Sequence, residues 1–304
     1  MRIILAGGTG FLGRALAGEL IAGGHEVSFL TRRAPPAAER GPVPELHWVP
    51  DGTAGPWAAA LDGADAIVNL AGESIAAGRW SAGRKARMRD SRLVATGSLV
   101  EAIRSAARPP SLLVSASAIG YYGSRGDEIL TEASAPGTDF LADLCVRWEA
   151  AARRAAEAGT RVVLVRTGVV LDRHEGALPR MLLPFRLVAG GPVGSGRQYV
   201  SWIHRADWVA LVLWAMATPA VSGPLNATAP NPVTNEAFAR AIGHALARPS
   251  WLRAPAFALR LALGEMADGL LLCSQRVVPA EAQQAGFRFR YEEVDRAVRD
   301  VLGT

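Results

Sequence analysis

Residues 3–13, "IILAGGTGFLG", join an apolar run to a glycine-rich turn and the start of a helical pattern. The three spaced glycines form a G-x-x-G-x-x-G motif. Glycine permits the tight turn and lets a pyrophosphate approach the backbone, with its charge at the N-terminus of the next helix. The motif predicts a dinucleotide-binding loop with contacts from Gly7, Thr9, Gly10, Phe11, Leu12 and Gly13. A plain strand–helix turn is the alternative, and the lack of G-K-[ST] argues against a nucleoside-triphosphate loop.

Apolar runs alternate with helix-compatible segments along most of the chain. Strands are predicted for "RIILAG", "HEVSFLT", "DAIVNLAG", "SLLVSAS", "RVVLVRTGVVL" and the later "PLNATAP". Such alternation of nearly all-apolar strands with helices indicates a parallel sheet covered on both faces. We expect a Rossmann-type, doubly wound α/β fold with a small, mainly helical C-terminal lobe. The dinucleotide-binding domain is expected over residues 1–230, with substrate-lobe insertions from about residue 175, and the C-terminal domain over 231–304.

Composition argues against several functional classes. The 304 residues carry a formal net charge of +5, but no basic run is interleaved with aromatic residues, so we expect no nucleic-acid partner. Cys145 and Cys273 fit neither a disulfide framework nor a metal site. The start "MRIIL" is expected to form a strand and not a signal peptide, and charges interrupt the most apolar late stretch. We expect a cytoplasmic protein with no membrane partner.

The second predicted strand ends "FLTRR", which places Thr31, Arg32 and Arg33 at its carboxyl end. A site that prefers NAD usually carries Asp or Glu there to bind the ribose 2′-hydroxyl. Guanidinium groups instead suit the 2′-phosphate of NADP through charge-assisted hydrogen bonds. We expect NADP(H) to be preferred over NAD(H); a solvated arginine pair is the alternative.

Three motifs in order, "GGTGFLG", "NLAG" and "SASAIGYYG", resemble those of the extended short-chain dehydrogenase/reductase superfamily. Longer stretches such as "GGPVGSGRQYVSWIHRAD" and "SQRVVPAEAQQAGFRFRY" resemble a divergent branch labelled "epimerase family protein", which includes the plastid giant-chloroplast protein. The resemblance implies an NAD(P)-binding fold with a small C-terminal domain of unknown role. It also implies that Asn69, Leu70, Ala71 and Gly72 line the cofactor and that Ser117 helps to polarise a substrate oxygen.

The superfamily's usual proton-transfer pair, Y-x-x-x-K on a helix, is absent, because no tyrosine has a lysine four residues on. The corresponding helix reads "DFLADLCVRWEAAARRAAEAG". If Glu149 is equivalent to an acidic residue that commonly follows the pair, Leu141 and Cys145 stand in the Tyr and Lys places. With Trp148 they form one helical stripe, which predicts a packed face and a buried, inert thiol. A nucleophilic Cys145 is the alternative.

Ser117 and either Tyr121 or Tyr122 are the remaining candidates for catalysis, although a loop tyrosine also serves as a packing residue with a hydrogen-bonded hydroxyl. By the resemblance, Arg92 lies where related enzymes have an asparagine near the active site. We include it among the cofactor contacts, and a cation there would favour an anionic substrate. His204, in "SWIHRAD", is interpreted as a structural histidine, with a general base as the alternative.

Two functions remain open. The first is an atypical NADP(H)-dependent oxidoreductase or epimerase-type enzyme that acts on a small polar molecule, which would be anionic if Arg92 faces the cleft. The second is a catalytically idle protein that binds NADP(H) and changes its contacts with a protein partner. The missing Tyr–Lys pair favours the second function, and the polar motifs that remain favour the first.

Overall fold

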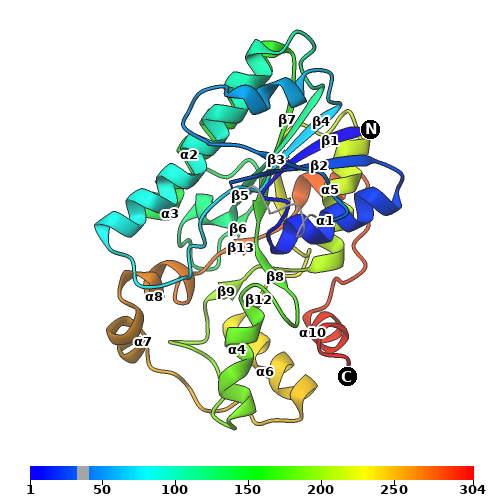
Figure 1. The fold of residues 1–304 in the computed structure, drawn as a ribbon. Coiled ribbons are helices and arrows are strands. Elements are labelled where there is room, and N and C mark those ends of the chain that lie inside the picture. The colour runs from blue at the N-terminus through cyan, green and yellow to red at the C-terminus, as the bar shows by residue number, and fades with distance from the viewer. Residues whose placement is uncertain (33–40) are drawn as a thin grey trace.

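The computed structural model describes residues 1–32 and 41–304 and is built around a parallel sheet of seven strands (Figure 1). Its strand order is β11-β7-β5-β4-β1-β2-β3. These strands are β1 (Arg2–Ala6), β2 (Glu26–Thr31), β3 (Glu45–His47), β4 (Ala66–Asn69), β5 (Leu112–Ala118), β7 (Arg161–Thr167) and β11 (Gly223–Ala227). The predicted doubly wound α/β fold is therefore confirmed. All carboxyl ends meet at one edge, where Ala6 lies opposite Asn69, and Ser117 opposite Arg166.

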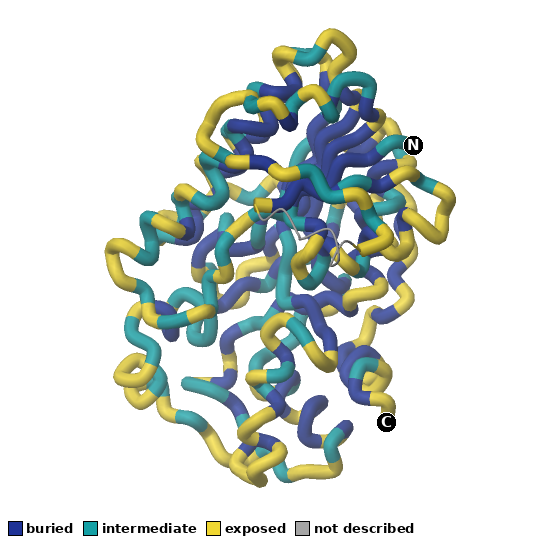
Figure 2. Tube along the Cα trace, in the orientation of Figure 1, coloured by how far each residue is buried: buried dark blue, intermediate teal, exposed yellow. Residues whose placement is uncertain are grey.

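Helices cover both faces of the sheet because successive strand residues point to opposite sides and both sides are apolar. Ile3 and Leu5 of β1 pack with α1 (Phe11–Ala22) and α5 (Arg205–Ala217). The alternate residues, Ile4 and Ala6, pack against the other face with α2 (Ala82–Ser105) and α3 (Phe140–Arg153). Figure 2 shows the strands as the most buried layer of the molecule.

A second, smaller core lies beyond the carboxyl edge of the sheet, and helices dominate it, as predicted. Its helices are α4 (Leu178–Arg186), α6 (Asn235–Leu246) and α10 (Val294–Leu302). Its short strands are β8 (Val169–Leu171), β9 (Tyr199–Val200), β10 (Trp202–His204) and β12 (Val233–Thr234). They pair as β8 with β10 and β9 with β12.

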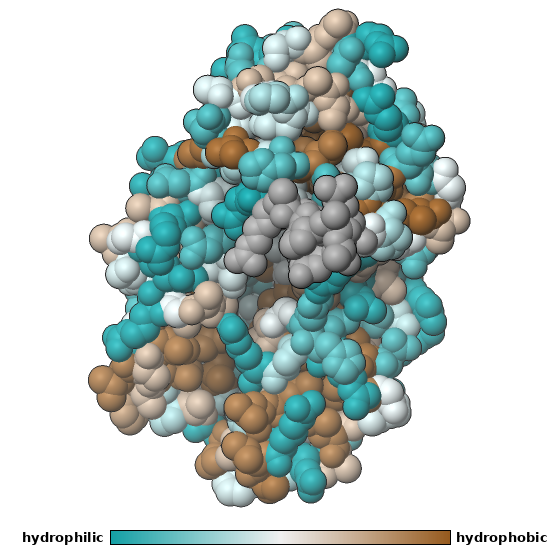
Figure 3. All heavy atoms as spheres, viewed as in Figure 1, coloured by the Kyte–Doolittle hydropathy of each residue, from teal (hydrophilic) through white to brown (hydrophobic). Residues whose placement is uncertain are grey.

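The tail of the chain returns to the first lobe. β13 (Arg276–Val277) pairs with β6 (Ile129–Leu130), and α9 (Ala280–Gln284) lies against β11. Before this return, α7 (Ala256–Leu263) and α8 (Glu265–Leu270) stand beside the start of α2 (Figure 1). No residue of α7 is buried, and apolar side chains gather on the surface where α7 lies (Figure 3). Within the described ranges, no helix is both long and apolar enough to cross a bilayer.

Candidate functional site

The glycine loop after β1 is packed so closely that side chains are excluded at two positions. Gly7 has a φ of +81°, and a Cβ there would lie 2.7 Å from the carbonyl carbon of Leu70. At Gly13, in the first turn of α1, a Cβ would lie 2.3 Å from the carbonyl oxygen of Gly7. The helix therefore starts directly against the turn. This is the backbone approach that a dinucleotide pyrophosphate requires.

The N-terminus of α1 carries no side-chain cap at Gly10, so the amide groups of its first turn are free to face a ligand. Thr9 is exposed, and its carbonyl oxygen accepts a hydrogen bond from the Arg14 guanidinium. Phe11 and Leu12 are half-buried and pack against the core. The residues present therefore fit a bound dinucleotide, with uncapped amides where its negative charge would lie.

The "NLAG" segment after β4 forms the facing wall. Asn69 is fully buried, donates to Thr96 Oγ1 at 2.9 Å, and accepts from the backbone N–H of Ala71 at 3.2 Å. These bonds fix the turn that brings Leu70 against Gly7. Asn69 thus stabilises the wall, and the backbone of Leu70 and Ala71 lies beside the glycine loop.

At the end of β2, Thr31 is buried and Arg32 is exposed. Arg33 lies outside the described residues. Arg32 directly follows the strand that neighbours β1, so the residue lies at the same edge of the sheet as the glycine loop. Its contact with a 2′-phosphate stays a prediction.

The stripe on α3 is a packed apolar face, as the sequence analysis expected: Leu141, Cys145 and Trp148 are all buried. A Cβ on Gly120, just after β5, would lie 3.2 Å from Leu141 Cβ and 3.9 Å from Cys145 Sγ. Burial, reinforced by the nearby Glu149 carboxylate, raises the pKa of the Cys145 thiol to about 12. The thiol stays protonated near neutral pH, which favours the inert alternative over a nucleophile.

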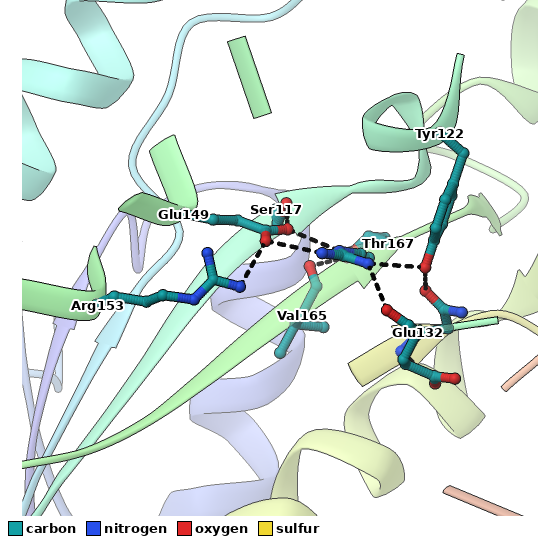
Figure 4. Close-up of polar contacts among 9 residues, drawn as sticks. Ser117, Tyr122, Glu132, Glu149, Arg153, Val165 and Thr167 are labelled. Atoms are coloured by element: carbon teal, nitrogen blue, oxygen red, sulfur yellow. Dashed lines mark hydrogen bonds and ion pairs between the residues drawn. The ribbon is translucent and has the colours of Figure 1, made fainter. Parts of the chain in front are cut away.

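Ser117 ends β5, as predicted, but its hydroxyl is already engaged (Figure 4). It donates a hydrogen bond of 2.7 Å to Glu149 Oε1. The same carboxylate accepts two hydrogen bonds from Arg166, at 2.7 and 2.9 Å, and one from Arg153 at 3.1 Å. Glu149 and Arg166 are each no more than 1% exposed, so a bidentate ion pair lies beneath the site.

The same guanidinium holds both candidate tyrosines. Arg166 Nη1 donates to the Tyr122 hydroxyl at 2.9 Å, and that hydroxyl donates to Asn226 Oδ1 at 2.7 Å. Tyr122 is fully buried, and its burial, only partly offset by Arg166, raises its pKa to about 12. Tyr121 is half-buried, with its ring centroid 3.5 Å from Arg166 Cζ. This geometry favours the packing alternative for Tyr122 and leaves Tyr121 nearer the surface.

Sequence reasoning missed the role of Arg166 altogether. Two signals were available: an arginine inside the apolar strand "RVVLVRT", and a carboxylate, Glu149, one residue after the apolar stripe of α3. A buried charge needs a partner, so each predicted an opposite charge nearby. Neither signal shows that the two would meet, because only the packing of α3 on β7 brings them together.

Arg92, on α2, lies under the facing wall of the glycine loop. Its Cζ is 5.2 Å from the Trp148 ring centroid, and a Cβ on Gly72 would come within 3.1 Å of it. Nη1 donates to the carbonyl oxygen of Met88 at 3.0 Å. Burial lowers the pKa of the guanidinium, and no carboxylate of the described residues lies within ion-pair distance. The partners recorded for this guanidinium are thus the Trp148 ring and a backbone carbonyl oxygen.

His204 has a structural role, which agrees with the interpretation preferred from the sequence. Its Nδ1 accepts a hydrogen bond of 3.1 Å from the backbone N–H of Ala206 and so caps α5. Its ring stacks on the Tyr291 ring, with centroids 3.9 Å apart. Burial lowers its pKa, so the ring stays neutral near pH 7. No cluster of three metal-binding side chains occurs among residues 1–32 and 41–304.

Fold and site together define a Rossmann-type protein of the short-chain dehydrogenase/reductase class. Residues 3–227 match the NAD dependent epimerase/dehydratase family, and residues 254–301 match a domain of unknown function, DUF1731. The chain belongs to the NAD dependent epimerase/dehydratase family, in the branch of epimerase family proteins that the sequence motifs resemble.

Relatives extend over almost the whole chain. An epimerase family protein of Mycobacterium bovis is 45% identical over 297 residues, which cover 97% of this chain and 96% of the relative. A chloroplastic SDR39U1 homolog of Arabidopsis thaliana is 40% identical, and the match covers 99% of this chain and 87% of the homolog. The crystal structure of human epimerase family protein SDR39U1 with NADPH is 36% identical, has a TM-score of 0.90 and covers 100% of both chains.

Proposed function

We propose that this protein is an NADP(H)-dependent oxidoreductase of epimerase type that acts on a small polar substrate with an anionic group. The observation that carries the proposal is the pairing of two features at one edge of the sheet: a glycine loop closed to side chains, and Arg92, for which the described residues provide no carboxylate within ion-pair distance. When bound, the nicotinamide supplies hydride transfer. The chain's own residues bind, orient and shield the reactants.

Preference for NADP(H) rests on Arg32 at the end of β2, since neither Thr31 nor Arg32 supplies the acidic side chain that binds a free 2′-hydroxyl. The human relative solved with NADPH supports the same preference. A 2′-phosphate would gain a charge-assisted hydrogen bond from Arg32, and the diphosphate would rest on the first amides of α1, those of Phe11, Leu12 and Gly13. Arg92 would then hold an anionic group on the wall formed by Gly72.

Proton transfer in this proposal does not use α3. Leu141 has no titratable group. The pKa values of the Cys145 thiol and the Tyr122 hydroxyl are both raised to about 12, so both groups keep their protons near neutral pH. Ser117 acts as a positioning residue because its hydrogen is directed to Glu149. The proton that accompanies hydride transfer would come from solvent, or from Tyr121 at the half-buried rim of the site.

A catalytically idle, NADP(H)-dependent regulatory protein is the second candidate. The observation in its favour is the closed hydrogen-bond network of Ser117, Glu149, Arg166 and Tyr122, which leaves the usual catalytic positions without a free proton donor (Figure 4). In that case nucleotide occupancy would alter contacts with a protein partner, with no turnover.

The two candidates separate in one assay. Purified protein with NADPH would be tested by loss of absorbance at 340 nm against a panel of carbonyl metabolites that do and do not carry a carboxylate or phosphate. Turnover confined to anionic carbonyls supports the enzyme. It should fall at least tenfold in Arg92→Ala and stay unchanged in Arg87→Ala, an exposed arginine on the same helix. Tight NADPH binding with no turnover on any compound supports the regulatory protein.

A further inference from the structure

A partly open cavity of about 220 Å³ lies where the two lobes meet, one helical turn from Cys145 along α3. Its apolar wall consists of Trp80, Phe140, Leu141 and Cys273. Trp80 precedes α2, and Phe140 and Leu141 begin α3, so three of these four residues come from the first lobe. Gly269 and Cys273 come from the segment that matches the domain of unknown function.

The carboxylates around the cavity are already satisfied. Glu265 forms an ion pair with Lys85, Asp268 forms one with Arg260 at 2.9 Å, and Asp139 caps α3 by accepting the N–H of Ala142 at 2.9 Å. Burial, with Asp139 nearby, raises the pKa of the Cys273 thiol to about 11, so this group is neutral as well. The wall left for a ligand is therefore mainly apolar, and the carboxylates around it disfavour an anionic one.

Trp80 is held in place to form this surface. Its Nε1 donates to the carbonyl oxygen of Ile75 at 2.9 Å, and its ring meets the Phe140 ring edge to face, with centroids 5.6 Å apart. On the other side, a Cβ on Gly269 would lie 2.7 Å from the Trp80 ring. The glycine of α8 therefore lets the edge of the indole approach the backbone of the C-terminal domain. A third ring entering the cavity would continue the edge-to-face arrangement that aromatic side chains prefer.

The size of the cavity suits one ring. An apolar cavity of about 150 Å³ is sufficient to bind benzene in a well-studied protein, and this one is larger. Leu141 also links the cavity to the predicted nicotinamide side, because it contacts Gly120 directly after β5.

From these contacts we propose that the cavity binds the aromatic ring of a small ligand, so that the ligand class is an aryl compound with an uncharged polar substituent. The C-terminal domain of unknown function completes the cavity with Gly269 and Cys273. The inference goes beyond the proposed function, and the cavity can be tested without turnover.

The probe is 4-fluorobenzyl alcohol, followed by ¹⁹F NMR line broadening on the full chain, with 2-fluoroethanol as the matched compound without a ring. Saturable binding of the aryl probe alone is expected. Cys273→Phe and the milder Cys273→Met, which fill the cavity, should weaken it at least tenfold and twofold, respectively. Leu261→Phe, on the exposed face of α7, enlarges a side chain outside the cavity and should leave binding unchanged.

Circular dichroism and NADPH titration of each variant establish that it is folded. Equal binding of both probes, or full aryl binding by folded Cys273→Phe, would overturn the inference. If the wild type binds NADPH but does not bind the aryl probe, the inference is overturned and the proposed function still stands. Aryl binding without any NADPH binding would retain the cavity and remove the proposed function.

Discussion

Glu149→Gln tests whether the buried ion pair organises the site. The change keeps the size of the side chain and removes the charge that faces Arg166, which is 1% exposed. The neutral amide leaves a guanidinium inside the protein without its counter-charge at 2.7 Å. Removing one partner of such a pair costs about 3–5 kcal/mol of the free energy of unfolding. That is a large part of the roughly 5–15 kcal/mol typical of a domain.

Urea unfolding followed by circular dichroism measures this loss, with Arg153→Gln as the control. Arg153 bonds the same carboxylate, but its side chain is 48% exposed, so its removal should cost no more than about 1 kcal/mol. The double variant Glu149→Gln/Arg166→Met removes both charges and should recover most of the lost stability. A Glu149→Gln loss as small as that of Arg153→Gln would refute the argument.

Further predictions concern the buried Cys145 thiol and the Asp139 cap of α3. Burial raises the pKa of Cys145 to about 12, above the ordinary thiol value near 9, so the protonated thiol contributes fully below about pH 9, and the contribution is lost as pH rises toward 12. In that window the free energy of unfolding of the wild type should therefore fall by up to about 1.4 kcal/mol per pH unit more than that of Cys145→Ala. Urea unfolding at pH 8 and 10.5 measures the difference, and equal losses in the two proteins would contradict this prediction. In the native state, Cys145 should resist iodoacetamide at pH 8 and react only after unfolding, as mass spectrometry of the labelled peptide would report. Asp139→Ala removes the cap of α3 and should cost about 0.5–2 kcal/mol of unfolding free energy, whereas Asp139→Ser should restore most of it.

Sequence reasoning identified the strands that carry the site because a strand buried on both faces must be apolar throughout. β1, β4, β5 and β7 all fall within predicted runs. The shortest strands gave no such signal, since their pairing depends on segments far apart in the chain. β13, for example, pairs Arg276 with Ile129. The sequence has no local feature that specifies that contact.

The candidate site likewise combines features that the local sequence determines with features that depend on contacts between distant residues. The glycine loop and the end of β5 could be predicted, because local backbone geometry and strand position determine them. The environment of Ser117 could not, because its partner Glu149 lies 32 residues away and is oriented by Arg166 on another strand. The cavity at Trp80 likewise depends on a glycine of the C-terminal domain, which approaches only in the folded chain.

The most direct test of dinucleotide binding is calorimetric titration of NADPH and NADH into wild type, Gly13→Ala and Gly18→Ala. A Cβ at Gly13 would strike the Gly7 carbonyl oxygen at 2.3 Å, whereas at Gly18, on the same helix, it meets nothing within 4 Å. We predict saturable heat with NADPH, a weaker response with NADH, at least a tenfold loss of affinity in Gly13→Ala, and no loss in Gly18→Ala. Absence of heat with both nucleotides in wild type, or equal affinity in the two alanine variants, would contradict it.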